Sequence, residues 1–208
     1  MFSFFKNLAV GLIDVNKPTY HSEWRDAVRR TKKFRLHIPK AANPKPHSVR
    51  YLSNDNMVKL AELYQQVIGP RRPEEVAGQC VSVHLETQEA ISGLLGCEVF
   101  FTLGWLFFSG TGTEWFKFDD CFIGNSLQNG LEGEVSLHAW LTLPSMEIID
   151  ATLATSIAVV RNQPEGLGGL TCKHADELTG GVRYKPMLVG EDFLVKSGAL
   201  RDVGIFLM

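Results

Sequence analysis

The sequence predicts an α+β domain in which helices pack against a mostly antiparallel β-sheet. Two segments carry apolar residues at helical spacing, a third is apolar on both alternations, and a cleanly alternating segment is followed by a short returning one. In chain order these segments are residues 55–68, 80–95, 97–108, 134–143 and 146–151. We expect residues 51–208 to form this domain and residues 1–50 to be a basic extension that packs on it.

The composition is that of an ordinary globular protein. The chain has 208 residues, of which 45% are hydrophobic and 21% charged, so it is long enough to bury a core and is not typical of disorder. The apolar stretch from Val99 to Phe108 is far shorter than the roughly 18 to 20 residues that cross a bilayer. We therefore expect a soluble protein without a transmembrane segment.

The cysteine pattern indicates free thiols. Nothing in their spacing pairs Cys80, Cys97, Cys121 and Cys172, and no cleavable export signal opens the chain. Disulfides persist mainly in oxidising compartments. The sequence therefore predicts a cytoplasmic protein.

Positive charge is concentrated near the N-terminus. Residues 21–50 contain nine Lys or Arg against Glu23 and Asp26, whereas the whole chain has a net charge of −2. Such a basic run is compatible with nucleic acid or anionic lipid, but it more often forms a solvated helix face followed by a loop. The sequence has no nucleic-acid-binding motif, so we expect no nucleic-acid partner.

The first 50 residues are expected to be helical and then extended. Residues 1–15 carry an apolar face suited to docking on the domain, on a twin subunit of a homo-oligomer, or on a membrane surface. Residues 22–34 are predicted to be helical with Ser22 as N-cap. Three prolines between residues 39 and 46 then favour an extended linker.

Residues 55–68 carry the clearest helical period in the sequence. Starting at Met57, apolar side chains recur at i, i+3, i+4, i+7, i+10 and i+11. A polar residue among positions 53–55 can cap the helix, and Gly69 is followed by a proline that ends it.

The next helix and strand surround the first candidate site residue. A helix is predicted from Cys80 to Leu95, with Gly96 as its stop, so that Cys80 lies in the first turn. Residues 97–108 are aromatic and β-branched on both alternations, as in a central strand covered on both faces. Residues 109–133 are predicted to be a long irregular connection, of the kind that often borders a site.

Residues 134–143 alternate between an apolar face and a mixed face. His138 and Trp140 share the mixed face, so His138 is predicted to point toward solvent or a cleft. A three-residue loop, Leu143 to Ser145, would place Asp150 directly opposite His138, on the same face. A two-residue turn would put Asp150 on the wrong face unless a bulge intervened.

The C-terminal segments are predicted from shorter patterns. The apolar run 151–160 continues the hairpin strand or starts another strand, and residues 163–181 are glycine-rich and irregular. Residues 182–189 are expected to form an edge strand that Pro186 interrupts, and residues 191–196 a short helix.

Cys80, His138 and Asp150 are the candidate catalytic residues. A cysteine attacks as the thiolate, which is favoured by a helix N-terminus, by an imidazole that holds the proton, and by a carboxylate that orients the imidazole. The three residues meet only if a helix end lies against a strand hairpin. Each also has an ordinary structural explanation, since cysteines are often buried and a strand readily carries a polar residue on its face or at its end.

Taken jointly, the motifs resemble the transglutaminase-like branch of the papain-like cysteine enzymes. They are Gly78-Gln79-Cys80 at a helix start, a strongly apolar strand after that helix, His138-x-Trp140 in an alternating strand, and Ile149-Asp150-Ala151-Thr152. The resemblance covers roughly residues 55–155. The chain departs from animal transglutaminases in having Val81 in place of a tryptophan after the cysteine, and in being far shorter.

The resemblance implies a papain-like or transglutaminase-like fold with a catalytic triad. Cys80 would be the nucleophile, His138 its acid–base partner and Asp150 the orienting group. The thioester formed on the cysteine would be resolved by water, in a peptidase or deamidase, or by an amine, in an acyl transferase. The substrate would be a protein or peptide, and no cofactor is implied.

The oxyanion and the substrate groove have several candidate residues. The backbone N–H of Cys80 is the natural first donor to the oxyanion, and Gln79 or a tryptophan such as Trp105 is a candidate second donor. Trp140 is expected either to form a wall of the substrate groove or to cover an edge of the core.

Two rival functions come from other classes. A non-catalytic module of this fold would use its groove or basic N-terminal region to bind a partner, and a membrane-surface adaptor would rely on residues 1–35. A metal site is not expected, because neither His84 beside Cys80 nor the Cys172-x-His174 motif has a second pair of ligands. The glycines at 166–169 are interpreted as a flexible loop.

Overall fold

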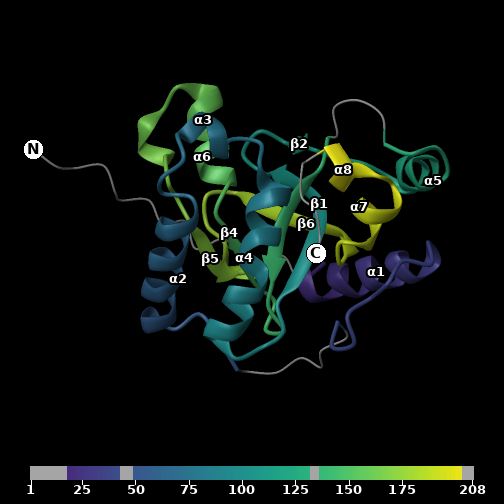
Figure 1. The fold of residues 1–208 in the computed structure, drawn as a ribbon, viewed down its shortest axis with the longest axis horizontal. Coiled ribbons are helices and arrows are strands. Elements are labelled where there is room, and N and C mark those ends of the chain that lie inside the picture. The colour runs from purple at the N-terminus through teal and green to yellow at the C-terminus, as the bar shows by residue number, and fades with distance from the viewer. Residues whose placement is uncertain (1–17, 43–48, 132–135, 203–208) are drawn as a thin grey trace, which may run out of the picture.

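The fold of a computed structural model is α+β, with one six-stranded sheet and helices on both of its faces (Figure 1). The structure describes residues 18–42, 49–131 and 136–202. The helices are α1 Tyr20–Lys33, α2 Asn54–Val67, α3 Pro73–Val76, α4 Cys80–Leu95, α5 Asp120–Asn129, α6 Leu153–Arg161, α7 Asp192–Lys196 and α8 Ala199–Asp202. The strands are β1 Phe100–Phe108, β2 Thr113–Trp115, β3 His138–Thr142, β4 Glu147–Asp150, β5 Thr171–His174 and β6 Val182–Val189.

Strand β1 is the centre of the sheet. Its residues 106–108 pair with both β2 and β6, and its residues 102–104 pair with both β3 and β6. Because a strand has two edges, β2 and β3 lie along one edge of β1 and β6 along the other. Strands β4 and β5 continue the sheet beyond β3, and every pair in the described residues is antiparallel. The predicted mostly antiparallel sheet is confirmed.

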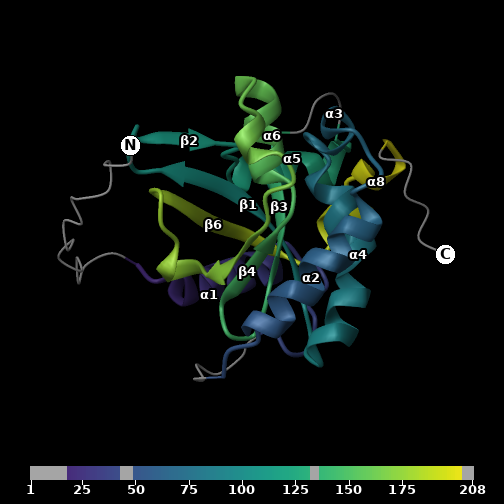
Figure 2. The same ribbon diagram turned by 90° about the vertical axis from the view of Figure 1, so that its left-hand side faces the viewer.

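The two faces of the sheet are buried under different helices. Ala139 and Leu141 of β3 belong to the core cluster that includes α4, whereas Trp140 belongs to the cluster that includes α1. In Figure 2, α2 and α4 lie together to one side of the strands and α1 lies beneath β6. Trp24 of α1 is fully buried against Phe100, with 5.5 Å between ring centroids. The alternation predicted for β3 is therefore real, but both of its faces are covered.

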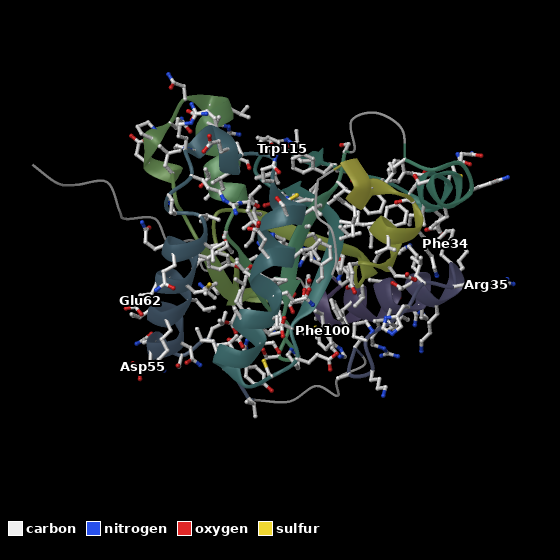
Figure 3. The ribbon with its side chains drawn as sticks, in the orientation of Figure 1. Phe34, Arg35, Asp55, Glu62, Phe100 and Trp115 are labelled. Carbon is white, nitrogen blue, oxygen red and sulfur yellow. The ribbon has the colours of Figure 1, made fainter. Side chains whose placement is uncertain are left out.

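The helices that the sequence predicted are present with small shifts. Thr19 caps α1 by accepting a hydrogen bond from the Ser22 N–H, so this helix begins two residues before the predicted start. Ser53 caps α2 in the same way, and Gly96, in the left-handed conformation with φ of 63°, ends α4 as predicted. On α2, Asp55 and Glu62 point to solvent (Figure 3).

Strand β1 begins at Phe100, three residues later than predicted. The reason is that helix α4 hydrogen-bonds the segment before it. Ser92 donates to the carbonyl of Cys97 at 2.7 Å, and Gln88 donates to the carbonyl of Val99 at 2.9 Å. These bonds hold the segment 97–99 against α4 instead of a neighbouring strand.

Two segments that were predicted to be irregular or extended are helical. The predicted irregular connection 109–133 contains β2 and α5, and the run 151–160, predicted as strand, contains α6. Asp119 is the N-cap of α5 and accepts the N–H of Phe122. Before α6, whose N-cap is Thr152, the side chain of Asp150 accepts the N–H groups of Thr152 and Leu153. In the run 151–160, the β-branched residues that favour a strand had less influence on the secondary structure than these hydrogen bonds at the start of the helix. Residues 171–174, predicted to be irregular, form the edge strand β5.

The hairpin of β3 and β4 has the predicted parity but not the predicted register. Leu141 pairs with Ile149, and the loop consists of three residues, Pro144 to Met146, with Met146 at a φ of 63°. Extended by one position, this register puts Asp150 opposite Trp140 and diagonal to His138. Diagonal neighbours on one face remain within reach of long side chains.

Several predictions concern residues outside the described ranges. The helix expected in residues 1–15 and its docking surface lie there, as do two of the three linker prolines. The predicted edge strand β6 runs through Pro186 without a break, and only its pairing with β1 shifts there, between Leu103 and Gly104. The predicted short helix at 191–196 is α7.

Gly104 is required where β1 passes β6 and Trp140. A Cβ at this position would overlap the backbone carbonyl of Lys185 and lie 2.6 Å from Trp140 Cη2. We expect Gly104→Ala to lower the free energy of unfolding by about 3 kcal/mol or to prevent folding, because a backbone carbonyl cannot move aside. Chemical denaturation followed by circular dichroism measures this effect.

The matched control is Gly93→Ala on the exposed side of α4. A Cβ there has open space, and alanine has the higher helix propensity, so stability should rise by about 0.5 to 1 kcal/mol. Equal stability of Gly104→Ala and the wild type would show that the tight contact of β1 with β6 does not exist.

Candidate functional site

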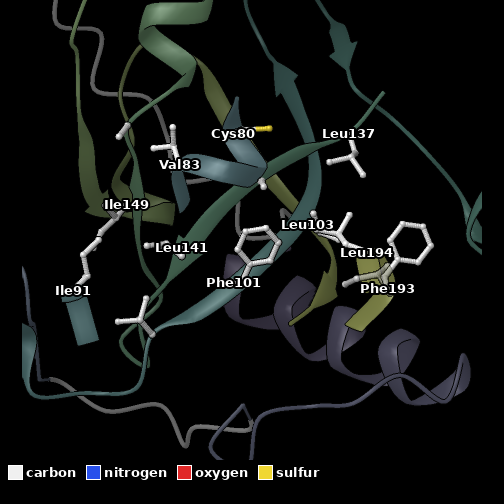
Figure 4. Close-up of a cluster of buried hydrophobic side chains, with 14 of the residues drawn as sticks. Cys80, Val83, Ile91, Phe101, Leu103, Leu137, Leu141, Ile149, Phe193 and Leu194 are labelled. Carbon is white, nitrogen blue, oxygen red and sulfur yellow. The ribbon is translucent and has the colours of Figure 1, made fainter. Parts of the chain in front are cut away.

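Cys80 lies at the first position of α4, at the wall of a cavity. The chain leaves α3, turns at Gly78 with a φ of 76°, and enters α4 at Cys80. The residue is 8% exposed and lines a cavity of about 400 Å³. In Figure 4 it lies at the upper margin of the hydrophobic cluster that includes Val83 and Leu141. The nucleophile candidate is thus at the boundary between core and cavity, at a helix N-terminus.

His138 connects Cys80 to Asp150. Its Nε2 lies 2.7 Å from Oδ2 of Asp150. The ring lines the same cavity as Cys80, and the nearby Cys80 side chain contributes to the raised pKa of His138. Because Nε2 is bonded to the carboxylate, Nδ1 is the nitrogen left to face the thiol. The structure therefore brings together the three residues predicted from the sequence, although His138 is only 3% exposed rather than open to solvent.

Asp150 is fully buried and accepts five hydrogen bonds. Besides His138, the hydroxyl of Tyr184 on β6 donates to Oδ2 at 2.8 Å. Oδ1 accepts the backbone N–H and the hydroxyl of Thr152, at 2.9 and 3.0 Å, and the N–H of Leu153 at 3.1 Å. One oxygen of the carboxylate therefore holds the start of α6, and the other orients His138.

The electrostatics favour an imidazolium–carboxylate pair. Burial lowers the pKa of His138, but the charge and hydrogen bond of Asp150, with a contribution from Cys80, outweigh it and raise this pKa to about 10. Burial raises the pKa of Asp150, yet the charge and hydrogen bond of His138 and the other donors bring it below its ordinary value. The folded protein thus favours the state in which both groups are charged.

A second buried histidine, His84, links the backbone of Cys80 to the backbone next to Asp150. Its Nδ1 lies 2.7 Å from the carbonyl oxygen of Cys80, and its Nε2 accepts the N–H of Ala151 at 3.2 Å. These roles require the neutral ring, with the proton on Nδ1, and burial lowers the pKa of His84 accordingly. The sequence showed only that His84 shares a helix face with Cys80.

Two aromatic residues that the sequence did not identify border the site. Trp115 and Phe116 line the cavity, and Trp115 lies near the N-terminal end of α4 (Figure 3). The Phe116 ring stacks on His138, with 5.7 Å between centroids and 22° between planes. Phe116 has a φ of 63°, which is uncommon for a residue with a side chain. The long connection 109–133 was predicted to border a site, and this part of it does.

Trp140 does not form a wall of a substrate groove. It is fully buried, its indole N–H donates to the hydroxyl of Tyr20 at 2.9 Å, and it lies outside the cavity lining. Its ring stacks on His138 at 5.9 Å. The second alternative given by the sequence, cover for the core, is the one observed, because α1 packs over this face of β3.

The two residues predicted as second oxyanion donors lie outside the cavity. The Gln79 side chain is exposed and accepts a hydrogen bond from Ser82 through Oε1. Trp105 lines a separate depression that includes Glu23 and Lys185. The first backbone N–H groups of α4 remain as donors, since the first intrahelical bond of this helix is donated by Val83 to Gln79.

Comparison with protein-family models, with curated proteins and with solved structures finds no match to this chain. Its own geometry is therefore the basis for a functional assignment. None of the helices in the described ranges combines the length and apolar character needed to cross a membrane. Within residues 18–42, 49–131 and 136–202, no three His, Cys, Asp or Glu side chains are grouped as metal ligands would be.

The basic N-terminal segment forms ion pairs within the molecule. Arg30 and Lys33 of α1 bind Asp120 at the start of α5, at 2.8 and 2.6 Å, and Arg50 binds Glu177 at 2.7 Å. These pairs are partly exposed, so each contributes little to stability. The pairs neutralise part of the positive charge that the sequence concentrates in residues 21–50.

The His138–Asp150 pair makes stability depend on pH. Unfolding returns His138 from a pKa of about 10 to the ordinary value of about 6.5. The folded state therefore binds the proton more tightly, and we expect the free energy of unfolding to fall as pH rises from about 6.5 to about 10. Urea denaturation at several pH values within this window measures the slope.

Two variants test the origin of that slope. His138→Gln keeps a hydrogen-bond donor but cannot be charged, so the decline should largely disappear. The exposed His37, replaced as His37→Gln, should leave the decline unchanged. An identical slope in His138→Gln and the wild type would contradict the charged pair.

Proposed function

We propose that this protein is a thiol-dependent amide hydrolase or acyl transferase of transglutaminase-like type. The observation that supports this most directly is the placement of His138, which is hydrogen-bonded to the Asp150 carboxylate and lines the same cavity as Cys80. A thiol, an imidazole and an orienting carboxylate in this order are the parts that nucleophilic cysteine catalysis requires. The helix N-terminus under Cys80 adds a favourable electrostatic field.

In the proposed reaction His138 carries the proton between steps. The Cys80 thiolate attacks the carbonyl carbon of an amide, and the C–N bond breaks as His138 donates its proton to the leaving amine. The acyl group stays on Cys80 as a thioester. Water or a second amine then attacks the thioester, with His138 as the base, and the thiolate is restored.

The oxyanion of the tetrahedral intermediate is assigned to the start of α4. The N–H groups of Cys80 and its successors precede the first intrahelical hydrogen bond and lie at the positive end of the helix. A backbone donor of this kind is fixed in place before the substrate arrives. Asp150 does not act on the substrate in this scheme, because its five hydrogen bonds hold His138 and the start of α6.

Selective alkylation tests the proposed nucleophile. Burial raises the pKa of Cys97 to about 11 and that of Cys172 to about 12, so both thiols are protonated at pH 6. In a Cys121→Ser background, which removes the exposed thiol, iodoacetamide at pH 6 should label Cys80 at least about tenfold faster than either. Peptide mass spectrometry over time gives the three rates.

The matched variants separate catalysis from folding. His138→Gln should slow labelling of Cys80 by about tenfold or more, because the imidazolium beside the thiolate is lost. His174→Gln removes a partly buried histidine on β5 and should not change the rate. Equal labelling of Cys80, Cys97 and Cys172 would instead favour a non-catalytic binding module.

A further inference from the structure

The cavity beside Cys80 has an apolar lining. Its large side chains come from the end of β2 and the residue after it, from the residue before β3, and from α6: Trp115, Phe116, Leu137, Leu153, Ile157 and Val160. Of the described residues that line it, none is Asp, Glu, Lys or Arg. His138 is the one residue of the lining whose charge the site favours, and it is already paired with Asp150.

The remaining polar side chain of the lining is already satisfied. Ser156 on α6 donates through its hydroxyl to the carbonyl of Thr152 at 2.8 Å. The Ser156 hydroxyl oxygen also accepts a hydrogen bond from the backbone N–H of Gly78 at 3.1 Å. A polar substrate group in the cavity would lose its water and gain little in return, which costs several kcal/mol for a charged group. An apolar group would meet side chains of its own kind.

We propose that the acyl group transferred to Cys80 is uncharged and apolar. This inference rests on the proposed function, because attack by the sulfur of Cys80 places the acyl carbon at the wall of this cavity. The cavity of about 400 Å³ falls in the range of sites that hold small organic groups. An aliphatic or aromatic group next to the scissile carbonyl fills it, and a carboxylate or ammonium in the same place is rejected.

The cavity mouth supports the same substrate class. Val160 lies at the end of α6 with 79% of its surface exposed, although it is a large hydrophobic residue. It continues the apolar lining outward to solvent. The guanidinium of Arg161 lies over the Trp115 ring at 5.8 Å, and Arg161 is not part of the lining. An entering acyl group therefore meets apolar surface from the mouth to the sulfur.

Acylation by p-nitrophenyl esters tests the acyl preference directly. In the Cys121→Ser background, the thiolate of Cys80 forms a C–S bond with the carbonyl carbon, the C–O bond breaks, and p-nitrophenolate leaves. Absorbance gives the rate, intact mass identifies the acyl group on the protein, and a Cys80→Ala sample supplies the blank. Each buried methylene should raise the rate about fourfold, so valerate should react more than about tenfold faster than acetate.

A charged ester of equal length provides the second comparison. The monoester of glutarate matches valerate in chain length but ends in a carboxylate, and we expect it to react at least about tenfold more slowly. The p-nitrophenyl esters of N-acetyl-leucine and 4-methylvalerate share one side chain. Faster reaction of the leucine ester identifies a peptide source of the acyl group, and faster reaction of 4-methylvalerate identifies a simple carboxylic acid.

Three variants locate the preference in the cavity. Ile157→Trp fills the cavity and should lower the ratio of valerate to acetate rates by about fivefold or more. Val160→Glu puts a charge at the exposed mouth, where it does not endanger folding, and should lower the same ratio. Val58→Glu, on a residue of α2 with 58% exposure outside the cavity, should leave the ratio unchanged.

The outcomes separate the inference from the function on which it rests. Acylation of Cys80 at equal rates by acetate, valerate and the glutarate monoester would overturn the apolar acyl group and leave the nucleophile in place. No acylation by any ester, together with no preferential alkylation of Cys80, would overturn the proposed function itself.

Discussion

The rest of the structure depends on the hydrogen bonds that surround the charged carboxylate of Asp150. A buried carboxylate is costly unless donors or cations surround it, and Asp150 is fully buried. Its five donors come from the start of β3, from the residues that open α6, and from Tyr184 on β6. Segments distant in the sequence must therefore reach their final places before this charge is satisfied. Folding of the sheet and assembly of the site are in this sense one process.

The same arrangement restrains the position of Cys80 relative to His138. Cys80 belongs to a helix and His138 to a strand, and packing alone would leave their relative position adjustable. The neutral His84 restrains it by joining the carbonyl of Cys80 to the N–H of Ala151, next to Asp150. In the described residues, every buried polar side-chain atom has a hydrogen-bond partner. The network around Asp150 therefore carries no desolvation penalty from an unpaired side-chain group.

Sequence patterns predicted what depends on local spacing. The phases of α2 and α4 and the alternation of β3 follow from periodicity, and they were enough to nominate Cys80, His138 and Asp150. The sequence left the length of the hairpin loop open, and the register that the loop sets differs from the one considered. The predictions were wrong where residues far away in the sequence determine the secondary structure or the burial of a segment. Helix α6 starts at Leu153, where the buried Asp150 accepts the N–H groups of Thr152 and Leu153. Trp140 is buried because α1, more than a hundred residues earlier, covers its strand. Trp115 and Phe116 reach the cavity through a β2 pairing that no local period marks.

Burial by α1 also strengthens the attraction between His138 and Asp150. The hydroxyl of Tyr20 on α1 accepts the indole N–H of Trp140, and Trp140 stacks on His138, so this helix excludes water from one side of the imidazole. Removing water lowers the effective dielectric and strengthens the attraction between His138 and Asp150, which exceeds the desolvation cost for the histidine. A segment predicted as an extension thus shapes the surroundings of His138, because α1 packs on the Trp140 ring that stacks on the imidazole. The field at Cys80 therefore depends on residues that lie far from it in sequence and do not contact the cavity.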